Sequence, residues 1–186
     1  MVNFSVDIPG MQGMGGILNG WQASGIWNMR SGQPLTVFVQ SNRSRSLWNP
    51  SIGPGIGLDR PSYAPGYGPD NAVTGNVDQW FNPAAFALQP AGTFGNTGRG
   101  DFIGPNLRTL DLALTKRASW GALGSGGRVE FRVEAFNVLN RANFGPPALI
   151  AFAGAADNEA PLATLGRITT TVTSARQIQL GVKVVF

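Results

Sequence analysis

The 186-residue chain contains no cysteine and no histidine. Without cysteine it cannot form disulfide bonds or use thiolate chemistry, and without histidine it lacks the commonest zinc ligand. The absence of histidine also removes the base of a serine, histidine and aspartate triad. We therefore expect no metal, no other cofactor and no enzymatic activity.

Charged residues are scarce, at 13% of the chain, and long hydrophobic runs are absent. No apolar run reaches the roughly 20 residues of a transmembrane helix, and no long stretch has the period of an amphipathic helix. The net charge of +4 is spread without a dense basic stripe, so we expect no binding to nucleic acid. With 26 glycines and 13 prolines, the composition favours an all-β protein.

Alternation of apolar and polar residues is the main signal that is present. It predicts five strands, at residues 2–9, 20–39, 107–116, 128–140 and 177–186. Within the second, Ser31 to Pro34 interrupts the pattern, and we expect a kink or bulge there because proline cannot donate to a strand ladder. The link before residue 128 is short and rich in glycine, so the third and fourth strands are expected to pair.

Each predicted strand has one apolar face and one largely polar face. The pattern fits a soluble sheet with its apolar face inward, and equally a membrane barrel with that face outward. Strand length favours the barrel, because about 9 to 11 residues cross the hydrocarbon layer. Aromatic residues near strand ends also favour it, as in interfacial belts: Trp21, Trp120, Phe136, Phe144 and Phe186. We therefore expect an all-β fold, an antiparallel transmembrane β-barrel segment in the outer membrane, in contact with lipid.

The polar faces carry charges of both signs, which are expected to line a wet lumen as structural residues: Asp111, Glu130, Arg132, Glu134 and Lys183. Two of these carboxylates could in principle form the catalytic pair of a glycosidase. Because arginines alternate with them, we expect salt bridges instead.

Two connections, residues 41–106 and 141–173, are long and rich in glycine, proline and alanine, with little periodicity. Short turns at one end and long loops at the other are typical of an outer-membrane barrel, whose long loops lie outside the cell. In the first connection, "SNRSRSLWNP" contains Arg43, Arg45 and Trp48, which could contact an anionic or sugar ligand, or lipopolysaccharide phosphates, at the outer surface. The alternative is a solvated loop with no specific role.

A soluble protein remains the alternative. The same alternation would fit an extracellular β-sandwich that binds carbohydrate through Tyr63, Tyr67 and Trp80. The glycine-rich stretches at 10–16 and 121–127 lack the lysine of a P-loop and are expected to be turns.

Four stretches occur in order along the chain: "GWQASGIWNMRSGQPLTV" at 20–37, "WFNPAAFALQPAGTFGNTGRGDFIGPNLRTLDLALTK" at 80–116, "FRVEAFNVLNRANFGPP" at 131–147 and "GRITTTVTSARQIQLGVKVVF" at 166–186. They cover about half of the chain. The chain thereby resembles the C-terminal end of TonB-dependent outer-membrane receptors, in the Oar-like branch whose members often carry a carboxypeptidase-regulatory-like domain.

This resemblance implies a barrel of about twenty-two strands with an N-terminal plug inside it. Such a receptor imports a solute with energy relayed by the TonB complex. The resemblance also implies that the last strand, ending at Phe186, is the signal read by the barrel-assembly machinery.

Several parts of such a receptor are missing from this sequence. We expect no plug, no TonB box and no signal peptide, and five strands cannot enclose a plug. An open sheet edge in lipid leaves unpaired backbone groups that cost several kcal/mol each. Residues 1–186 are therefore expected to be the C-terminal part of a receptor barrel, a fragment or truncated product that does not transport by itself. The TonB complex would act only through the missing plug, on a solute that the sequence does not identify.

Overall fold

A computed structural model describes residues 1–10, 19–46 and 58–186. The chain divides into two compact units. The sheet unit comprises Met1–Arg30, Leu107–Asn143 and Thr173–Phe186, and the loop unit comprises Ser31–Asn106 and Phe144–Val172. Among the described residues, no helix combines the length and the hydropathy that a membrane-spanning helix needs.

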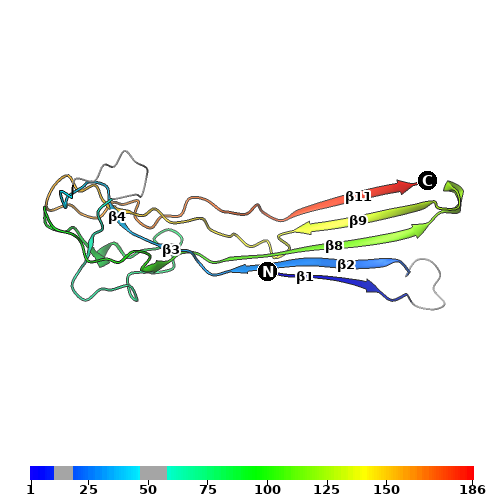
Figure 1. The fold of residues 1–186 in the computed structure, drawn as a ribbon, viewed down its shortest axis with the longest axis horizontal. Helices are drawn as coiled ribbons and strands as arrows, with labels where there is room; N and C mark the ends of the chain where they lie inside the picture. Colours follow the sequence, from blue (N-terminus) through cyan, green and yellow to red (C-terminus); the bar gives the residue numbers. More distant parts are fainter. Residues whose placement is uncertain (11–18, 47–57) are drawn as a thin grey trace. The chain divides into compact units, whose positions relative to one another are not determined.

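The sheet unit is a five-stranded antiparallel sheet with the order β1, β2, β8, β9, β11 (Figure 1). The strands are β1 (Val2–Ile8), β2 (Trp21–Arg30), β8 (Leu107–Ser119), β9 (Arg128–Phe136) and β11 (Gln177–Val185). The predicted pairing of the third and fourth strands is confirmed, with a register that runs from Leu112 opposite Ala135 to Ser119 opposite Arg128. The all-β fold predicted from the alternation is confirmed as well.

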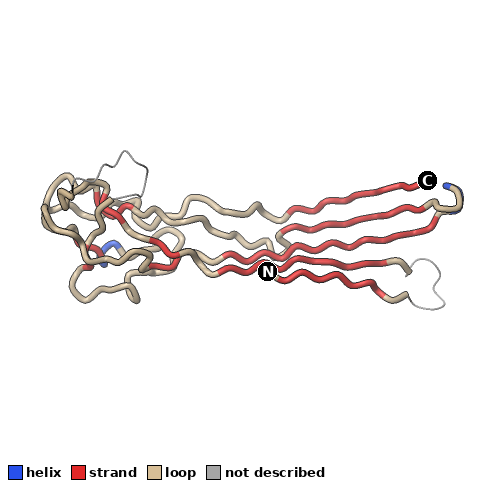
Figure 2. The backbone as a smooth tube through the Cα atoms, in the orientation of Figure 1, coloured by secondary structure: helices blue, strands red, loops and turns tan. Residues whose placement is uncertain are grey.

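Both long connections leave from the same end of this sheet (Figure 2). At that end Arg30 lies opposite Leu107, and Phe136 lies opposite Gln177. The link between β8 and β9, which contains the 3-10 helix η4 (Gly121–Leu123), closes the opposite end. The sheet therefore has the asymmetry of short and long connections that the sequence predicted.

The register fixes which side chains share a face, because directly opposed residues in a strand pair point to the same side. Leu112 lies opposite Gly25 on β2 and Ala135 on β9. The same row continues to Phe4 on β1 and to Ile178 on β11. One apolar row thus crosses all five strands, and the alternate rows carry the polar side chains on the other face.

The apolar face of the sheet is exposed. Leu180 is 75% exposed, Phe131 49% and Phe4 45%. Soluble monomers rarely expose contiguous apolar patches larger than a few hundred Å². Because apolar surface in water costs about 25 cal/mol per Å², this face requires an apolar environment.

The loop unit has a hydrophobic core of its own, which the sequence did not predict. Its centre is an aromatic cluster of Tyr63, Phe81, Phe86 and Phe102, whose ring centroids lie between 5.3 and 6.4 Å apart. The aliphatic and alanine part of the core is Leu35, Val37, Val39, Ala72, Ala85, Ala151 and Leu165, with Phe152. Leu35, Val37 and Val39 alternate and were predicted as part of the second strand, whereas the other core residues are irregularly spaced and gave no periodic signal.

Short strands connect the segments of the loop unit. The antiparallel pairs are β3 (Pro34–Leu35) with β7 (Phe102–Ile103) and β5 (Ser62–Tyr63) with β6 (Phe86–Ala87), and β4 (Phe38–Val39) runs parallel to β10 (Ile150–Phe152). The 3-10 helix η3 spans Pro83–Ala85. The predicted interruption at Ser31 to Pro34 is present, but it ends β2 outright, because the residues that follow pair within the loop unit.

Strand β9 ends at Phe136, four residues before the predicted end at residue 140. Asn137 ends it with a left-handed backbone, φ 48°, which asparagine tolerates better than most residues. Its side-chain amide donates to the carbonyl oxygens of Arg141, at 3.0 Å, and Ser174, at 2.9 Å. Asn137 is only 5% exposed, so these bonds are sheltered from water and hold the segment before β11 against the end of β9.

A second buried asparagine supports the same junction. Asn143 Oδ1 accepts a hydrogen bond from the backbone N–H of Arg108 at 2.8 Å, and Asn143 Nδ2 donates to Thr173 Oγ1 at 3.0 Å. The segment after β9 is thereby attached both to the start of β8 and to the approach to β11.

Replacing Asn137 by alanine is expected to destabilise the folded chain by about 2–4 kcal/mol. The substitution removes buried hydrogen bonds and places a less tolerant residue at positive φ. Asn137→Gly keeps the backbone freedom and is expected to lose less. Urea unfolding of the complete barrel in lipid vesicles measures both.

The matched control is Asn140→Ala, which also changes an asparagine with positive φ, 47°, but one whose side chain is exposed. We expect a loss of about 1 kcal/mol, from the strained backbone and the bond to the Arg176 N–H. An Asn137→Ala chain as stable as the parent would contradict this explanation of the strand end.

Candidate functional site

The polar face of the sheet carries an ion pair that links two of its strands. Arg117 Nε on β8 lies 3.2 Å from Glu130 Oε2 on β9, and Arg117 Nη2 donates to Gln22 Oε1 on β2 at 3.1 Å. Lys183 on β11 lies directly opposite Glu130 in the register. Exposed ion pairs contribute only about 0–1 kcal/mol each to stability. The charged side chains of this face therefore stabilise the sheet little, but they make the face compatible with water.

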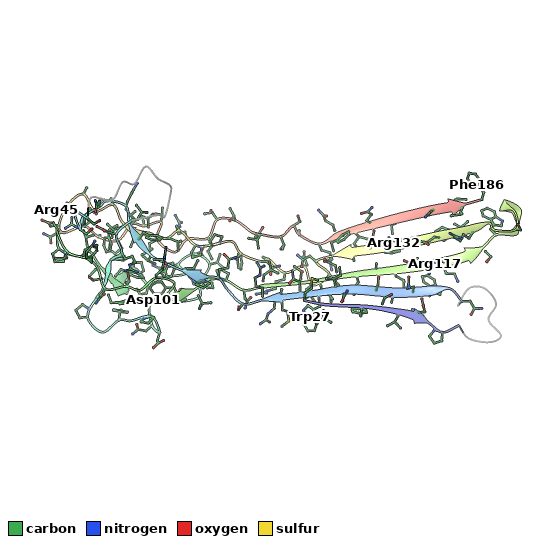
Figure 3. The ribbon with its side chains drawn as sticks, viewed as in Figure 1. Trp27, Arg45, Asp101, Arg117, Arg132 and Phe186 are labelled. Atoms are coloured by element: carbon green, nitrogen blue, oxygen red, sulfur yellow. The ribbon has the colours of Figure 1, made fainter. Side chains whose placement is uncertain are left out.

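A second ion pair lies on β9 itself, where Arg132 Nη2 is 3.0 Å from Glu134 Oε1. The arginine side chain is 51% exposed and the glutamate side chain 23%. Figure 3 labels Arg117 and Arg132 on their neighbouring strands. The sequence predicted salt bridges on this face but missed Arg117, because the predicted strand ended one residue earlier.

Asp111 lies apart from these pairs, at the end of the sheet where the long connections leave. Its Oδ1 accepts the backbone N–H of Asn137 at 2.7 Å. Both residues line a pocket of about 380 Å³, together with Asn28, Leu107, Thr109, Phe136, Thr173, Ser174, Ala175 and Gln177. The register places the strand residues among these on the polar face.

The pocket has the composition of a site for a polar, uncharged or weakly basic ligand. Its side chains offer hydroxyl and amide groups, one carboxylate from Asp111 and an aromatic ring from Phe136, and no Lys or Arg lines it. Hydroxyl and amide groups both donate and accept hydrogen bonds, while the ring offers an apolar surface. The sequence signal that could have found this pocket is the mostly polar segment from Thr173 to Arg176, directly before β11.

The loop unit contains the predicted ligand-binding residues, and it uses Arg43 internally. Arg43 is 8% exposed. Its guanidinium donates to the carbonyl oxygens of Gln89, at 3.1 Å, and Ala156, at 3.3 Å, and to Asp157 Oδ1 at 2.5 Å. The structure thus gives Arg43 a structural part in place of the exposed position expected from the sequence. Its contact with an anionic or sugar ligand stays a prediction.

Next to these partners, Glu159 closes a turn of the loop unit. Its carboxylate accepts the backbone N–H groups of Gly154, Ala155 and Ala156 at 2.7 to 2.8 Å. These hydrogen bonds, with that from Gly154 first, hold the pKa of Glu159 below its usual value. The carboxylate therefore stays ionised and keeps the carbonyls that Arg43 contacts in place.

Arg45, in contrast, is exposed and sits at the tip of a well-anchored turn (Figure 3). Its φ is 57°. On one side Asn42 Oδ1 accepts the Ser46 N–H at 3.3 Å, and on the other Asp59 accepts the N–H and hydroxyl of Ser44 at 2.6 and 2.7 Å. The turn thus presents the Arg45 guanidinium to solvent. Trp48, the third residue of the predicted group, lies outside the described residues.

The aromatic residues of the carbohydrate alternative pack against the core of the loop unit. Tyr63 Oη donates to Asp101 Oδ2 at 2.9 Å, and Trp80 Nε1 donates to the carbonyl oxygen of Ile103 at 3.2 Å. Burial and the bond to Asp101 raise the pKa of the Tyr63 hydroxyl. Tyr67 Oη accepts from Asn82 at 3.4 Å. These rings serve packing and do not form an open sugar platform.

Among the described residues, no three acidic side chains come close enough together to hold a metal ion. Of the two glycine-rich stretches, 121–127 forms the turn that contains η4, as predicted, and most of 10–16 lies outside the described residues.

Comparison with known families identifies the kind of protein to which this sheet belongs. The family described as an outer membrane beta barrel domain matches residues 1–179. Searches of curated proteins and of solved structures found no match. The soluble β-sandwich is therefore wrong, because the sheet exposes its apolar face and the family is a membrane one. The predicted location is confirmed: the chain belongs to the family of outer membrane β-barrel domains and resides in the outer membrane.

Proposed function

We propose that the chain is the C-terminal part of the barrel of a TonB-dependent receptor of the Oar-like branch, and that it contributes to energy-coupled uptake of a solute. The observation that carries this proposal is the division of the sheet into an exposed apolar face and a polar face with ion pairs and a pocket. In this arrangement the apolar face contacts lipid and the polar face borders the aqueous lumen. The chain forms part of the barrel wall and part of a ligand-binding surface, and it catalyses no reaction.

The edges of the sheet support the view that further strands complete the barrel. Among the described residues, β1 and β11 each pair along one edge only. In lipid, the unpaired backbone groups of a free edge would cost several kcal/mol each. Because the five strands alternate in direction, β1 and β11 run the same way and cannot pair antiparallel with each other. An antiparallel barrel therefore needs an odd number of additional strands between them.

The finer assignment is supported by the four stretches that resemble TonB-dependent receptors. The loop unit would then lie outside the cell, where Arg45 contacts the incoming solute, and the pocket beside Asp111 would be a contact inside the lumen. The TonB complex would act through a plug, and the barrel-assembly machinery would read the last strand at Phe186, which is 94% exposed.

Solute uptake tests the proposal. Cells that produce the complete receptor are incubated with a mixture of small solutes, and depletion of each solute from the medium is measured with and without TonB. We expect at least one solute whose depletion requires both the receptor and TonB. Uptake that persists undiminished without TonB, or no receptor-dependent depletion, rejects the transport function.

The same uptake assay distinguishes the expected role of Arg45 from that of Arg43. Arg45→Ala is expected to slow uptake without lowering the amount of receptor in the membrane, because its guanidinium faces solvent. Arg43→Ala is expected to reduce the amount of folded receptor, because the backbone carbonyls of Gln89 and Ala156 lose their donor. Unchanged uptake by Arg45→Ala counts against a ligand contact there.

Charge placed on one face or the other tests the lipid contact. Leu112→Arg is expected to destabilise the intact barrel by roughly 2–4 kcal/mol, because Leu112 lies midway along the apolar face of β8. Phe131→Arg should cost less, because Phe131 lies opposite Lys116, nearer to the end of the apolar face. The matched control is Ala113→Arg, on the next residue of β8, whose side chain lies on the polar face opposite Glu134. Urea unfolding in lipid vesicles measures all three, and equal stabilities of Leu112→Arg and Ala113→Arg would reject the facing.

A further inference from the structure

The apolar face of β8 is bounded by a cation at each end. Its side chains on that face are, in order, Arg108, Leu110, Leu112, Leu114 and Lys116. Each cation belongs to the apolar face by register, since Arg108 lies opposite Met29 and Lys116 opposite Trp21. A charged side chain on the lipid side of a barrel needs a polar group within its reach.

The spacing of the two cations matches the height of the hydrocarbon layer. Eight residues at roughly 3.4 Å per residue separate them by about 27 Å along the strand. At a strand tilt of about 40° this gives a height of about 21 Å, close to the apolar band of about 25 Å on barrels of this kind. Side chains of this length can extend along the apolar surface so that their charged ends reach the headgroups.

The two cations differ in what they contact. Lys116 Nζ lies 5.4 Å from the ring centroid of Trp21 and donates to the carbonyl oxygen of Asn19. The Arg108 side chain is exposed, and none of the described residues pairs with its guanidinium. Its backbone is fixed by the bond from its N–H to Asn143. A guanidinium that is exposed at the edge of the apolar face and has no partner among the described residues can pair with an anion from outside the chain.

We propose that Arg108 binds a phosphate of lipid A in the outer leaflet of the outer membrane. Arg108 lies at the end of the sheet from which the long connections leave, and in outer-membrane barrels that end is the extracellular one. The headgroups at that level belong to lipopolysaccharide, whose lipid A carries phosphate groups. The planar guanidinium pairs with phosphate through two parallel hydrogen bonds.

Trp27 completes the site beside Arg108. It is 49% exposed on the same face and lies one row nearer to the sheet centre, opposite Leu110. Figure 3 labels Trp27 on β2. An indole ring at the headgroup level is favourable because it is apolar with one polar edge. Trp27 therefore contacts the acyl chains next to the glucosamine headgroup while Arg108 holds the phosphate.

The test is lipid binding by the full chain as part of the barrel extracted from the outer membrane. The apparent Kd is measured for lipid A, for dephosphorylated lipid A, for phosphatidylglycerol and for inorganic phosphate. We expect lipid A to bind about tenfold more tightly than its dephosphorylated form. Arg108→Gln should remove the tenfold difference in Kd. Arg108→Lys keeps the charge but cannot make two parallel hydrogen bonds to phosphate, so it should keep part of the difference.

The matched control is Arg128→Gln, the same substitution at an exposed arginine on the polar face. It should leave lipid A binding unchanged. Preference for phosphorylated lipid A that survives in Arg108→Gln overturns the proposal. So does equal binding of phosphatidylglycerol, which would assign a general phospholipid site, or equal binding of inorganic phosphate, which would assign a soluble anion site. The proposal rests on the outer-membrane location and not on solute uptake, so loss of TonB-dependent transport would leave it standing.

Discussion

The hydrogen-bonded register of the five-stranded sheet is the constraint on which the remaining structure depends. Once Leu112 lies opposite Gly25 and Ala135, every alternate side chain on all five strands is assigned to one face. A shift of one residue between β8 and β9 would bring Glu134 and Arg132 onto the apolar face. The ion pairs of the polar face, the pocket beside Asp111 and the position of Arg108 all follow from this single register.

The same constraint explains why the chain suits a membrane. A single sheet with one apolar face has no interior in which to bury that face. In the barrel that we propose, lipid covers the apolar face and the aqueous lumen hydrates the ion pairs of the polar face. The loop unit is stabilised in a different way, because it buries an aromatic cluster and Arg43 in a hydrophobic core of its own. Within the loop unit, the hydrogen bonds of Asn42 and Asp59 hold the turn that carries Arg45.

Much of the sheet could be predicted from the sequence, because alternation is a local signal that strands display directly. Its ends could not: β8 continues through Arg117 to Ser119, and β9 stops where Asn137 takes a positive φ. The core of the loop unit was missed because it depends on contacts distant in sequence.

The residues of the candidate site could likewise be predicted only in part from the sequence. The predicted charged residues of the polar face were found because each alternates with apolar residues along its own strand. The burial of Arg43 was not, since it depends on carbonyls near Ala156, far along the chain. The pocket forms because the segment at Ser174 packs beside the end of β9. This tertiary contact leaves no periodic pattern in the sequence.

The most direct test of the central claim uses the absence of native cysteine. Single cysteines are placed at residues 130 to 134 of β9 in the barrel within native outer membranes, and labelling by a charged, water-soluble maleimide is measured at each. The account predicts rapid labelling at 130, 132 and 134 and strong protection at 131 and 133. Labelling that is uniform along the strand, or faster at Phe131→Cys and Val133→Cys than at their neighbours, would contradict it.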